Sequence, residues 1–305
     1  MRKNTKYGGV IVPMVSPLSA EGTVDTACLG RLIDHLVDNG AKPFLLGTTG
    51  EAPSLSMEVR RSMVASAARQ LRKRELLFVG ISNTCFKDSL EDATYFEEAG
   101  ADVLVATPPA YYPLNDEGLL RYFEELADAL PLPLMLYNMP ATTKISIPLA
   151  VVEQLSKHPN IVGLKDSERD EQRVLSAIEY WRERDDFVFV SGWAASSLWA
   201  LQAGADGIVP STGNLTPDLY VALYNAALRG DSAEAQRLQE QTDALSLLYQ
   251  KDKVLSQSLP ALKLLLQLKD LCSAHVAPPL YRMSPEEEQN YLQEMKKELE
   301  KREVL

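Results

Sequence analysis

Lys165 is the residue in this sequence best suited to covalent chemistry. It directly follows the apolar run 161–164, and a lysine at the inner end of a buried strand is costly unless something uses it. An uncharged amine there could attack a carbonyl carbon and form a Schiff base. A free lysine has a pKa of about 10.4, so neutrality near pH 7 costs about 4–5 kcal/mol, part of which a desolvated site would supply. The alternative is a lysine that extends to the rim beside Asp166.

Two further features could complete such a site. Tyr137 ends the apolar run 134–137, and its phenol could pass a proton to a carbinolamine or a leaving alkoxide. Residues 47–51 contain two glycines, which allow a sharp turn, and Thr48 and Thr49 add hydroxyl donors. This turn suits a carboxylate better than a diphosphate, because no P-loop lysine accompanies it. The alternatives are a tyrosine that caps a barrel and an ordinary tight turn.

Several loop residues are expected to surround these groups. Tyr111 and Tyr112 lie in the proline-rich segment 107–113, and adjacent exposed tyrosines of this kind are typical of an interface. Segments 191–192 and 209–210 follow later apolar runs, so they are expected to complete a ring of loops.

Eight short apolar runs are predicted to be the strands that position these residues. They do not alternate with polar residues, as expected for parallel strands that are covered on both faces. The runs are residues 9–14, 43–46, 76–79, 103–106, 134–137, 161–164, 187–190 and 207–209. Eight strand–helix units in succession predict an α/β fold, a (β/α)8 TIM barrel, whose catalytic groups gather where the strands end. An open doubly wound sheet is the alternative, but no GxGxxG motif follows the first strand.

The segments between and after these runs have the apolar spacing of helices. The clearest are residues 25–39, 56–71, 87–99 and 116–129. After residue 217 the strands stop, and helices are predicted at residues 217–229, 232–249, 256–271 and 284–301. Ser284, followed by a proline and a run of glutamates, is a strong start signal. We expect residues 1–225 to form the barrel with the active site and residues 226–305 to form a C-terminal helical subdomain.

The bulk composition excludes several classes of function. The chain has 305 residues, of which 46% are hydrophobic and 24% charged, as in ordinary globular proteins. No stretch approaches the roughly 18 consecutive apolar residues of a membrane span, and no signal core is apparent, so a cytoplasmic location is expected. A net charge of −11 disfavours nucleic-acid binding, and it means that an anionic substrate must be held by locally placed donors.

The cysteines and histidines disfavour a metal site. Their positions form neither a CxxC pattern nor an HExxH pattern, and buried thiols are the simpler interpretation of the cysteines. The residues are Cys28, Cys85 and Cys272, with His35, His158 and His275.

Taken together, the motifs resemble the dihydrodipicolinate synthase / N-acetylneuraminate lyase family of class I aldolases. The most specific parts are Gly-Thr-Thr-Gly-Glu at 47–51, Tyr-Asn-Met-Pro at 137–140 and Gly-Leu-Lys-Asp-Ser at 163–167, and the resemblance covers nearly the whole chain. It implies a lyase that forms a lysine Schiff base with pyruvate or another 2-oxo acid, with an aldehyde as the second reactant. It also implies no metal or organic cofactor and a homotetramer built as a dimer of dimers.

The resemblance also implies a role for each matching position. Lys165 would form the imine and Tyr137 would relay protons, with Thr48 as its hydrogen-bond neighbour. Tyr111 would complete the relay by reaching into the adjacent subunit. Thr48 and Thr49 would hold the substrate carboxylate, and Gly192 and Val209 would line the site with backbone carbonyls.

The sequence departs from true dihydrodipicolinate synthases in the outer part of the site. Those enzymes carry an arginine two residues beyond the proline of the Tyr-Asn-x-Pro segment, where it binds the carboxylate of the second substrate. Here that substrate-binding position is Thr142, which cannot replace a bidentate guanidinium, and Lys144 is shifted along the chain. The lysine-feedback site also differs. Met57, Thr84 and Ala110 stand where regulated synthases carry histidine, asparagine and tyrosine.

The segment 165–167 resembles the sugar-acid and hydroxy-oxo-acid aldolase branches of the family instead. With these departures, the resemblance implies a lyase of 2-oxo-3-deoxy sugar acids or 4-hydroxy-2-oxo acids. Trp193 follows Gly192 and is expected either to shape the outer pocket or to pack in the core. Three alternatives remain open: a sugar-acid dehydratase that uses the same imine, dihydrodipicolinate synthase proper, and a non-catalytic 2-oxo acid binding protein. A fourth is an unrelated barrel enzyme of phosphorylated substrates, for which residues 211–214 offer a weak phosphate loop.

Overall fold

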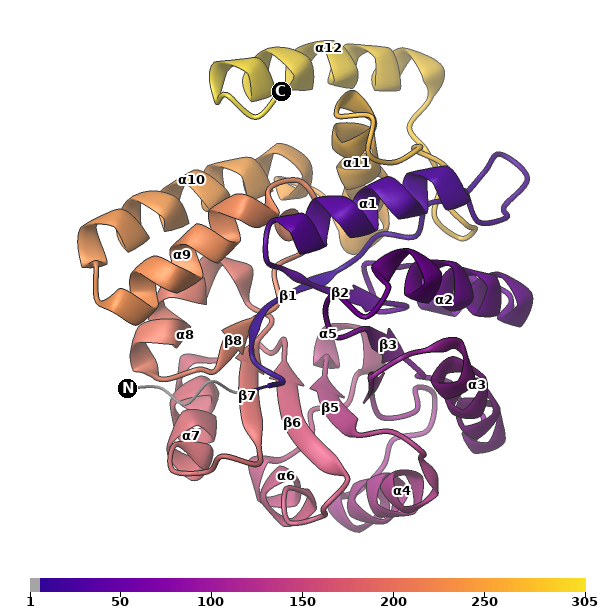
Figure 1. Cartoon of the computed structure of the whole chain (residues 1–305), viewed down its shortest axis with the longest axis vertical. Coiled ribbons are helices and arrows are strands. Elements are labelled where there is room, and N and C mark those ends of the chain that lie inside the picture. The colour runs from indigo at the N-terminus through magenta and orange to yellow at the C-terminus, as the bar shows by residue number, and fades with distance from the viewer. Residues whose placement is uncertain (1–5) are drawn as a thin grey trace.

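The computed structural model describes residues 6–305, and within them eight parallel strands close into a barrel (Figure 1). Each strand pairs with the next along the chain, and β1 pairs with β8. The strands are β1 (Gly9–Pro13), β2 (Lys42–Leu45), β3 (Phe78–Gly80), β4 (Val103–Ala106), β5 (Leu134–Asn138), β6 (Ile161–Asp166), β7 (Val188–Ser191) and β8 (Gly207–Ile208). The predicted (β/α)8 barrel is confirmed, and the open sheet is excluded.

Helices follow the strands and surround the barrel (Figure 1). They are α1 (Thr26–Asp38), α2 (Met57–Leu71), α3 (Phe86–Ala99), α4 (Asp116–Ala129), α5 (Pro140–Thr143), α6 (Leu149–Leu155), α7 (Glu171–Trp181), α8 (Ser197–Ala203) and α9 (Pro217–Arg229). Short 3-10 turns follow β2, β7 and β8: η1 (Ala52–Ser54), η2 (Ala194–Ser196) and η3 (Ser211–Asn214). The four helices predicted before residue 130 are confirmed to within one or two residues at each end.

Three more helices form the predicted C-terminal extension. They are α10 (Ser232–Gln250), α11 (Leu255–Leu268) and α12 (Pro285–Lys301). Helix α10 packs against α8 and α9, α11 packs against α10, and α12 packs against α11 at one end of the molecule (Figure 1). Ser284 caps α12 in a capping box with Glu287, as its start signal predicted. Residue 225 lies inside α9, so the division at 225/226 stays a proposal.

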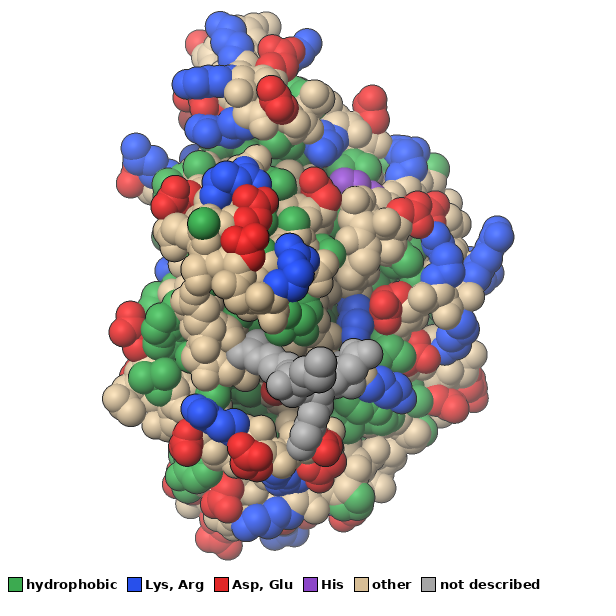
Figure 2. Space-filling model, turned by 60° about the vertical axis from the view of Figure 1, so that its left-hand side comes forward, with side chains coloured by type: hydrophobic (Ala, Val, Ile, Leu, Met, Phe, Trp, Pro, Cys, Tyr) green, Lys and Arg blue, Asp and Glu red, His purple; other side chains and the backbone are tan. Residues whose placement is uncertain are grey.

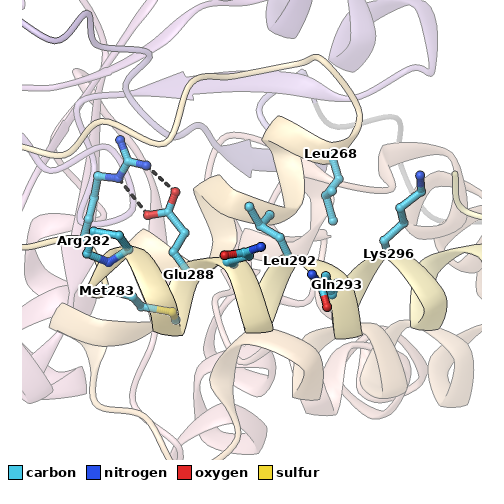
Figure 3. A pocket seen from close by; sticks show the side chains of 9 residues that line it. Leu268, Arg282, Met283, Glu288, Leu292, Gln293 and Lys296 are labelled. Carbon is cyan, nitrogen blue, oxygen red and sulfur yellow. Dashed lines mark hydrogen bonds and ion pairs between the residues drawn. The ribbon is translucent and has the colours of Figure 1, made fainter.

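A cavity of about 710 Å³ lies between α12 and the C-terminal end of α11 (Figure 3). Leu268 and Leu292 line its apolar part. Beside them Arg282 forms an ion pair with Glu288, with Nε 3.0 Å from Oε2. All of its lining residues belong to α11 or to later segments, so this cavity is separate from the strand ends.

The barrel interior is filled by one cluster of mainly apolar side chains. They are Ile11, Phe44, Phe78, Val103, Val105, Met135, Tyr137, Val162, Val188, Val190 and Val209. Tyr137 therefore faces the inside of the barrel. The third strand begins at Phe78 rather than at the predicted Leu76. The amide of Leu77 instead donates to the Asp102 carboxylate at 2.9 Å.

The surface carries both signs of charge. Acidic and basic side chains are interspersed on the face shown in Figure 2, without a large patch of one sign. Between residues 6 and 305, no helix combines the length and apolar character that crossing a membrane would require.

Candidate active site

The carboxyl ends of the strands open into a cavity of about 780 Å³. Its walls come from the ends of β1, β5 and β6, from segments that follow β2, β5, β6, β7 and β8, and from α10 and α11. Seven of the predicted site residues line it: Thr48, Thr49, Tyr137, Thr142, Lys165, Gly192 and Val209. The structure thus brings together residues that lie far apart in the sequence.

Lys165 and Tyr137 lie side by side at the inner end of this cavity. Their strands pair in a register that places Tyr137 opposite Lys165. The Nζ atom of Lys165 lies 3.3 Å from the centroid of the Tyr137 ring and 5.3 Å from that of Phe44. Strand β6 extends two residues beyond the predicted run, since Lys165 and Asp166 continue to pair with β5 and β7. A strand residue is held more rigidly than a loop residue, which suits a nucleophile.

The environment of Lys165 favours the uncharged amine. The side chain is buried, with 4% of the residue exposed, so it does not extend to the rim beside Asp166. Burial lowers the pKa of Lys165, and the opposing influences of Tyr137 and Asp166 are smaller. The amine is therefore better prepared to attack a carbonyl carbon than a solvated lysine would be.

The phenol of Tyr137 is connected to polar groups of two other loops. Its hydroxyl lies 3.2 Å from Oγ1 of Thr48, and the Ser167 hydroxyl is a further hydrogen-bond neighbour. These contacts orient the phenol beside Lys165, where it could exchange a proton with a substrate oxygen. The sequence analysis gave Ser167 no role of its own, although its place directly after β6 and two residues beyond Lys165 was a usable signal.

The turn at residues 47–51 offers the backbone amides of Thr48 and Thr49 as donors, while the amides of Gly50 and Glu51 close the turn. The amide of Gly50 donates to the carbonyl of Gly47 at 3.1 Å, and that of Glu51 donates to Thr48 at 3.2 Å. Gly50 leaves little room for a side chain, because a Cβ atom there would lie 3.0 Å from the Met14 carbonyl oxygen. In the described chain, the amides of Thr48 and Thr49 make no hydrogen bond to protein atoms. Both are available to an anionic group.

A buried polar network behind the site ties the ends of β5 and β6 together. Asn138 donates to both oxygens of Asp166, at 3.1 and 3.2 Å, and to Glu168 at 2.9 Å. Arg173 of α7 donates from Nε to Asp166 at 2.7 Å and from a terminal nitrogen to the Ile147 carbonyl at 2.8 Å. Asn138 and Asp166 directly follow Tyr137 and Lys165, so the network holds the two strand ends in register. Sequence reasoning missed it, because Arg173 reaches the site only through the packing of α7.

Gly192 brings the loop after β7 close to Ser167. A Cβ atom at this position would lie 2.1 Å from the Ser167 Oγ atom and 3.1 Å from the Asp166 carbonyl oxygen, so a side chain here would displace the Ser167 hydroxyl. The Gly192 amide donates to the carbonyl of Asp166 at 2.6 Å, and the amide of Val209 donates to Ser191 at 2.7 Å. Trp193 lines the cavity.

The C-terminal helices supply part of the outer cavity wall. Ser246, Tyr249 and Gln250 of α10 line it together with Ser211. The Tyr249 hydroxyl lies 2.8 Å from Oγ of Ser211 and accepts a hydrogen bond from Gln250 at 2.8 Å. These residues carried no recognisable motif, since their place in the site depends on how α10 packs across the barrel. They give the outer cavity a polar surface suited to hydroxyl groups.

Tyr111 lies outside this assembly. It is 85% exposed and does not line the cavity. Its ring packs edge-on against Tyr112 at 5.0 Å between centroids, and its backbone has a φ of 99°. A bulky residue in this region of φ is strained, and such strain is concentrated at functional positions.

The arrangement of these site residues agrees with the similarity of the chain to known proteins. Residues 6–299 match the family model described as the dihydrodipicolinate synthetase family. A 4-hydroxy-tetrahydrodipicolinate synthase of Acidiphilium cryptum is 31% identical over 84% of this chain and 85% of its own length. The putative 2-dehydro-3-deoxy-D-gluconate aldolase YagE of Escherichia coli is 30% identical over 92% of this chain and 93% of its own.

Solved structures extend the similarity to the whole fold. A dihydrodipicolinate synthase of Bacteroides thetaiotaomicron has a TM-score of 0.91 and 34% identity, and covers 97% of this chain and 100% of its own. YagE in complex with pyruvate has a TM-score of 0.90 and 28% identity, and covers 98% and 99%. These similarities argue against two of the alternatives: an unrelated barrel enzyme of phosphorylated substrates and a non-catalytic 2-oxo acid binding protein. The chain belongs to the dihydrodipicolinate synthetase family, and it is a class I lyase that acts through a Schiff base with pyruvate or a related 2-oxo acid.

Proposed function

We propose that this lyase cleaves or forms 2-oxo-3-deoxy sugar acids or 4-hydroxy-2-oxo acids through an imine on Lys165. The observation that carries the proposal is the buried Nζ atom of Lys165, 3.3 Å from the centre of the Tyr137 ring. Tyr137 is in turn 3.2 Å from the Thr48 hydroxyl. A nucleophile, a proton-transfer group and a carboxylate site then adjoin one another at the inner end of one cavity.

The reaction follows from the polarity of an imine. Nζ of Lys165 attacks C2 of the 2-oxo acid, water leaves, and the resulting cation withdraws electrons from C3. Tyr137 supplies the proton that leaves with that water and so becomes a phenolate. The phenolate accepts the proton of the C4 hydroxyl while the C3–C4 bond breaks, so the electron pair remains on C3 as an enamine, an aldehyde departs, and the restored phenol holds the proton that C3 then takes. Protonation at C3 and hydrolysis of the imine then release pyruvate and restore the amine. Condensation is the same sequence in reverse.

Binding of the substrate is assigned to two parts of the cavity. The free amides of Thr48 and Thr49, together with their hydroxyls, would hold the carboxylate, and the backbone at Gly192 and Val209 would lie along the reacting carbons. The outer part would receive the aldehyde portion, where Ser211, Gln250 and Thr142 offer hydroxyl and amide groups. The similarity to YagE, a putative aldolase of 2-dehydro-3-deoxy-D-gluconate, supports a hydroxylated chain.

A pyruvate-release assay over deoxy sugar acids, hydroxy-oxo acids and sialic acid tests this function. We expect release from a sugar acid or a hydroxy-oxo acid, and condensation with the matching aldehyde in reverse. Loss of water from the sugar acid without pyruvate release would instead identify a dehydratase that uses the same imine. No turnover of any 2-oxo acid would contradict the proposal.

Condensation of pyruvate with aspartate semialdehyde is a second candidate, because several relatives are named 4-hydroxy-tetrahydrodipicolinate synthase. Thr142 argues against it. It lines the cavity, but its hydroxyl donates to the Met139 carbonyl at 3.2 Å. We expect the native protein to condense aspartate semialdehyde poorly and Thr142→Arg to gain about tenfold or more, since a guanidinium binds a carboxylate bidentately. Efficient condensation by the native protein would refute this argument.

The pH dependence of imine formation should reflect the lowered pKa of Lys165. Only the uncharged amine attacks, so at saturating pyruvate the rate of trapping with cyanoborohydride should rise with pH and then level off. Because burial holds the pKa of Lys165 below its ordinary value of 10.5, the midpoint of the rise should fall below that of a free lysine. A midpoint at or above 10.5 would show that the site does not activate the amine.

The exposed tyrosine pair leads to a proposal about assembly. We propose that the chain forms a homotetramer, a dimer of dimers, in which Tyr111 enters the partner's site and completes the proton relay. The exposure and strained backbone of Tyr111 support this. Light scattering should give four chains per particle, and a monomer with full activity would contradict it.

A cytoplasmic location and independence from metals and cofactors stay predictions from the sequence.

A further inference from the structure

A buried ion pair connects the carboxylate-binding turn to the C-terminal helices. Glu51 closes the turn that contains Thr48 and Thr49, and Lys263 lies in the middle of α11. Both side chains are almost wholly buried, at 0% and 1% exposed. Lys263 Nζ contacts Oε1 of Glu51 and donates to the His275 carbonyl at 2.5 Å. The other oxygen of Glu51 accepts the amide of Ala277 at 2.8 Å.

The backbone of Glu51 has an unfavourable conformation for a residue that carries a side chain. Its φ is 56°, in the left-handed region that residues other than glycine and asparagine seldom adopt. Its amide closes the turn onto the Thr48 carbonyl at 3.2 Å, while the Gly50 carbonyl accepts the Ser16 hydroxyl at 2.6 Å. The position of the Glu51 side chain is therefore linked through one turn to the amides of Thr48 and Thr49.

A buried ion pair is not the usual way in which a protein core is stabilised. Apolar residues of similar size often stabilise a core as well as a buried charge pair does, whereas removing one partner leaves an uncompensated charge. A charged pair does fix one geometry, because one carboxylate oxygen contacts the Lys263 ammonium and the other accepts the Ala277 amide. The second donor, Ala277, also comes from the C-terminal region, so two elements outside the barrel hold one residue of the active-site turn.

We propose that Glu51 and Lys263 are positioning residues through which the C-terminal helices set the carboxylate-binding geometry of the turn. The inference rests on the proposed function, because it takes the turn to bind the 2-oxo acid. Neither residue lines the active-site cavity. The pair acts through the placement of the Thr48 and Thr49 amides, so its loss should weaken the binding of pyruvate more than it slows the chemistry at Lys165.

The test compares Lys263→Met, Glu51→Gln and the double variant E51Q/K263M, which leaves no unpaired charge. The readouts are the pyruvate concentration that half-saturates cyanoborohydride trapping and the trapping rate at saturation. We expect the half-saturating concentration to rise roughly tenfold or more, since small misplacements of a binding group have effects of this size. The saturated rate should change much less, and Lys263→Arg should restore part of the affinity.

Lys269→Met is the matched control. Lys269 follows the end of α11 and donates to the Leu215 carbonyl at 3.3 Å, away from the turn. It should keep the native half-saturating concentration, and thermal melting checks that each variant is folded. A folded E51Q/K263M double variant with native affinity for pyruvate would overturn the inference alone. A native protein that pyruvate and hydride leave unmodified would overturn the proposed function, and the inference with it.

Discussion

Replacement of Lys165 by methionine is expected to abolish turnover, with a loss on the order of 10⁴–10⁶-fold in kcat, because no other group at the inner end of the cavity can form the imine. Methionine has nearly the same length and fits between the rings of Tyr137 and Phe44. The variant should therefore fold normally and lose all modification by pyruvate and hydride. Lys157→Met, at an exposed lysine of the surface pair with Glu153, is the control and should behave as the native protein. Substantial residual turnover in Lys165→Met would assign the imine elsewhere.

The same substitution should raise the free energy of unfolding near neutral pH. In the folded protein, burial lowers the pKa of Lys165 below its ordinary value, so between the two values the unfolded chain binds more protons than the folded one. Under that condition the free energy of unfolding rises with pH, and at neutral pH the buried amine lowers it. Methionine removes this effect. Denaturant titration at pH 7 should show the gain, and the gain should shrink as the pH approaches 10.5.

Replacement of Tyr137 by phenylalanine is expected to lower kcat by roughly 10²–10⁴-fold, the usual contribution of a positioned proton-transfer group. The ring beside Lys165 is retained, but the hydroxyl that lies 3.2 Å from Thr48 is lost. The half-saturating concentration of pyruvate should change little, because the carboxylate donors are untouched. The imine should still form, more slowly than in the native protein.

The control for this variant is Tyr180→Phe, at a half-exposed tyrosine on α7, which should leave the rate unchanged. A rate close to native in Tyr137→Phe would remove the phenol from the mechanism. A rise in half-saturating pyruvate with unchanged kcat would instead assign it to binding.

The barrel could be predicted from the sequence because parallel strands leave a strong signal. Runs such as residues 103–106 and 134–137 are buried on both faces, so they lack alternation. Each is followed by a segment with helical spacing. The ends of the strands were harder to predict. β6 continues through Asp166, since its last residues pair with both neighbouring strands, and β3 starts late because the Leu77 amide is bound by the Asp102 side chain. Such hydrogen bonds depend on tertiary neighbours rather than on local pattern.

The inner site was predictable for a related reason. In this fold, residues just after apolar runs meet at one end of the barrel, which brought Thr48, Tyr137 and Lys165 to one cavity. The residues that surround them were missed where they come from helices. Arg173, Tyr249 and Lys263 have ordinary positions in amphipathic segments, and only the packing of α7, α10 and α11 brings them to the site. No local pattern distinguishes them from other helix residues.

The most direct test of the central claim is peptide mapping of the native protein after treatment with pyruvate and borohydride. The account predicts a single reduced pyruvate adduct per chain, located on Lys165 and absent when pyruvate or hydride is omitted. An unmodified chain, or an adduct on a different lysine such as Lys253 of the outer cavity, would contradict it.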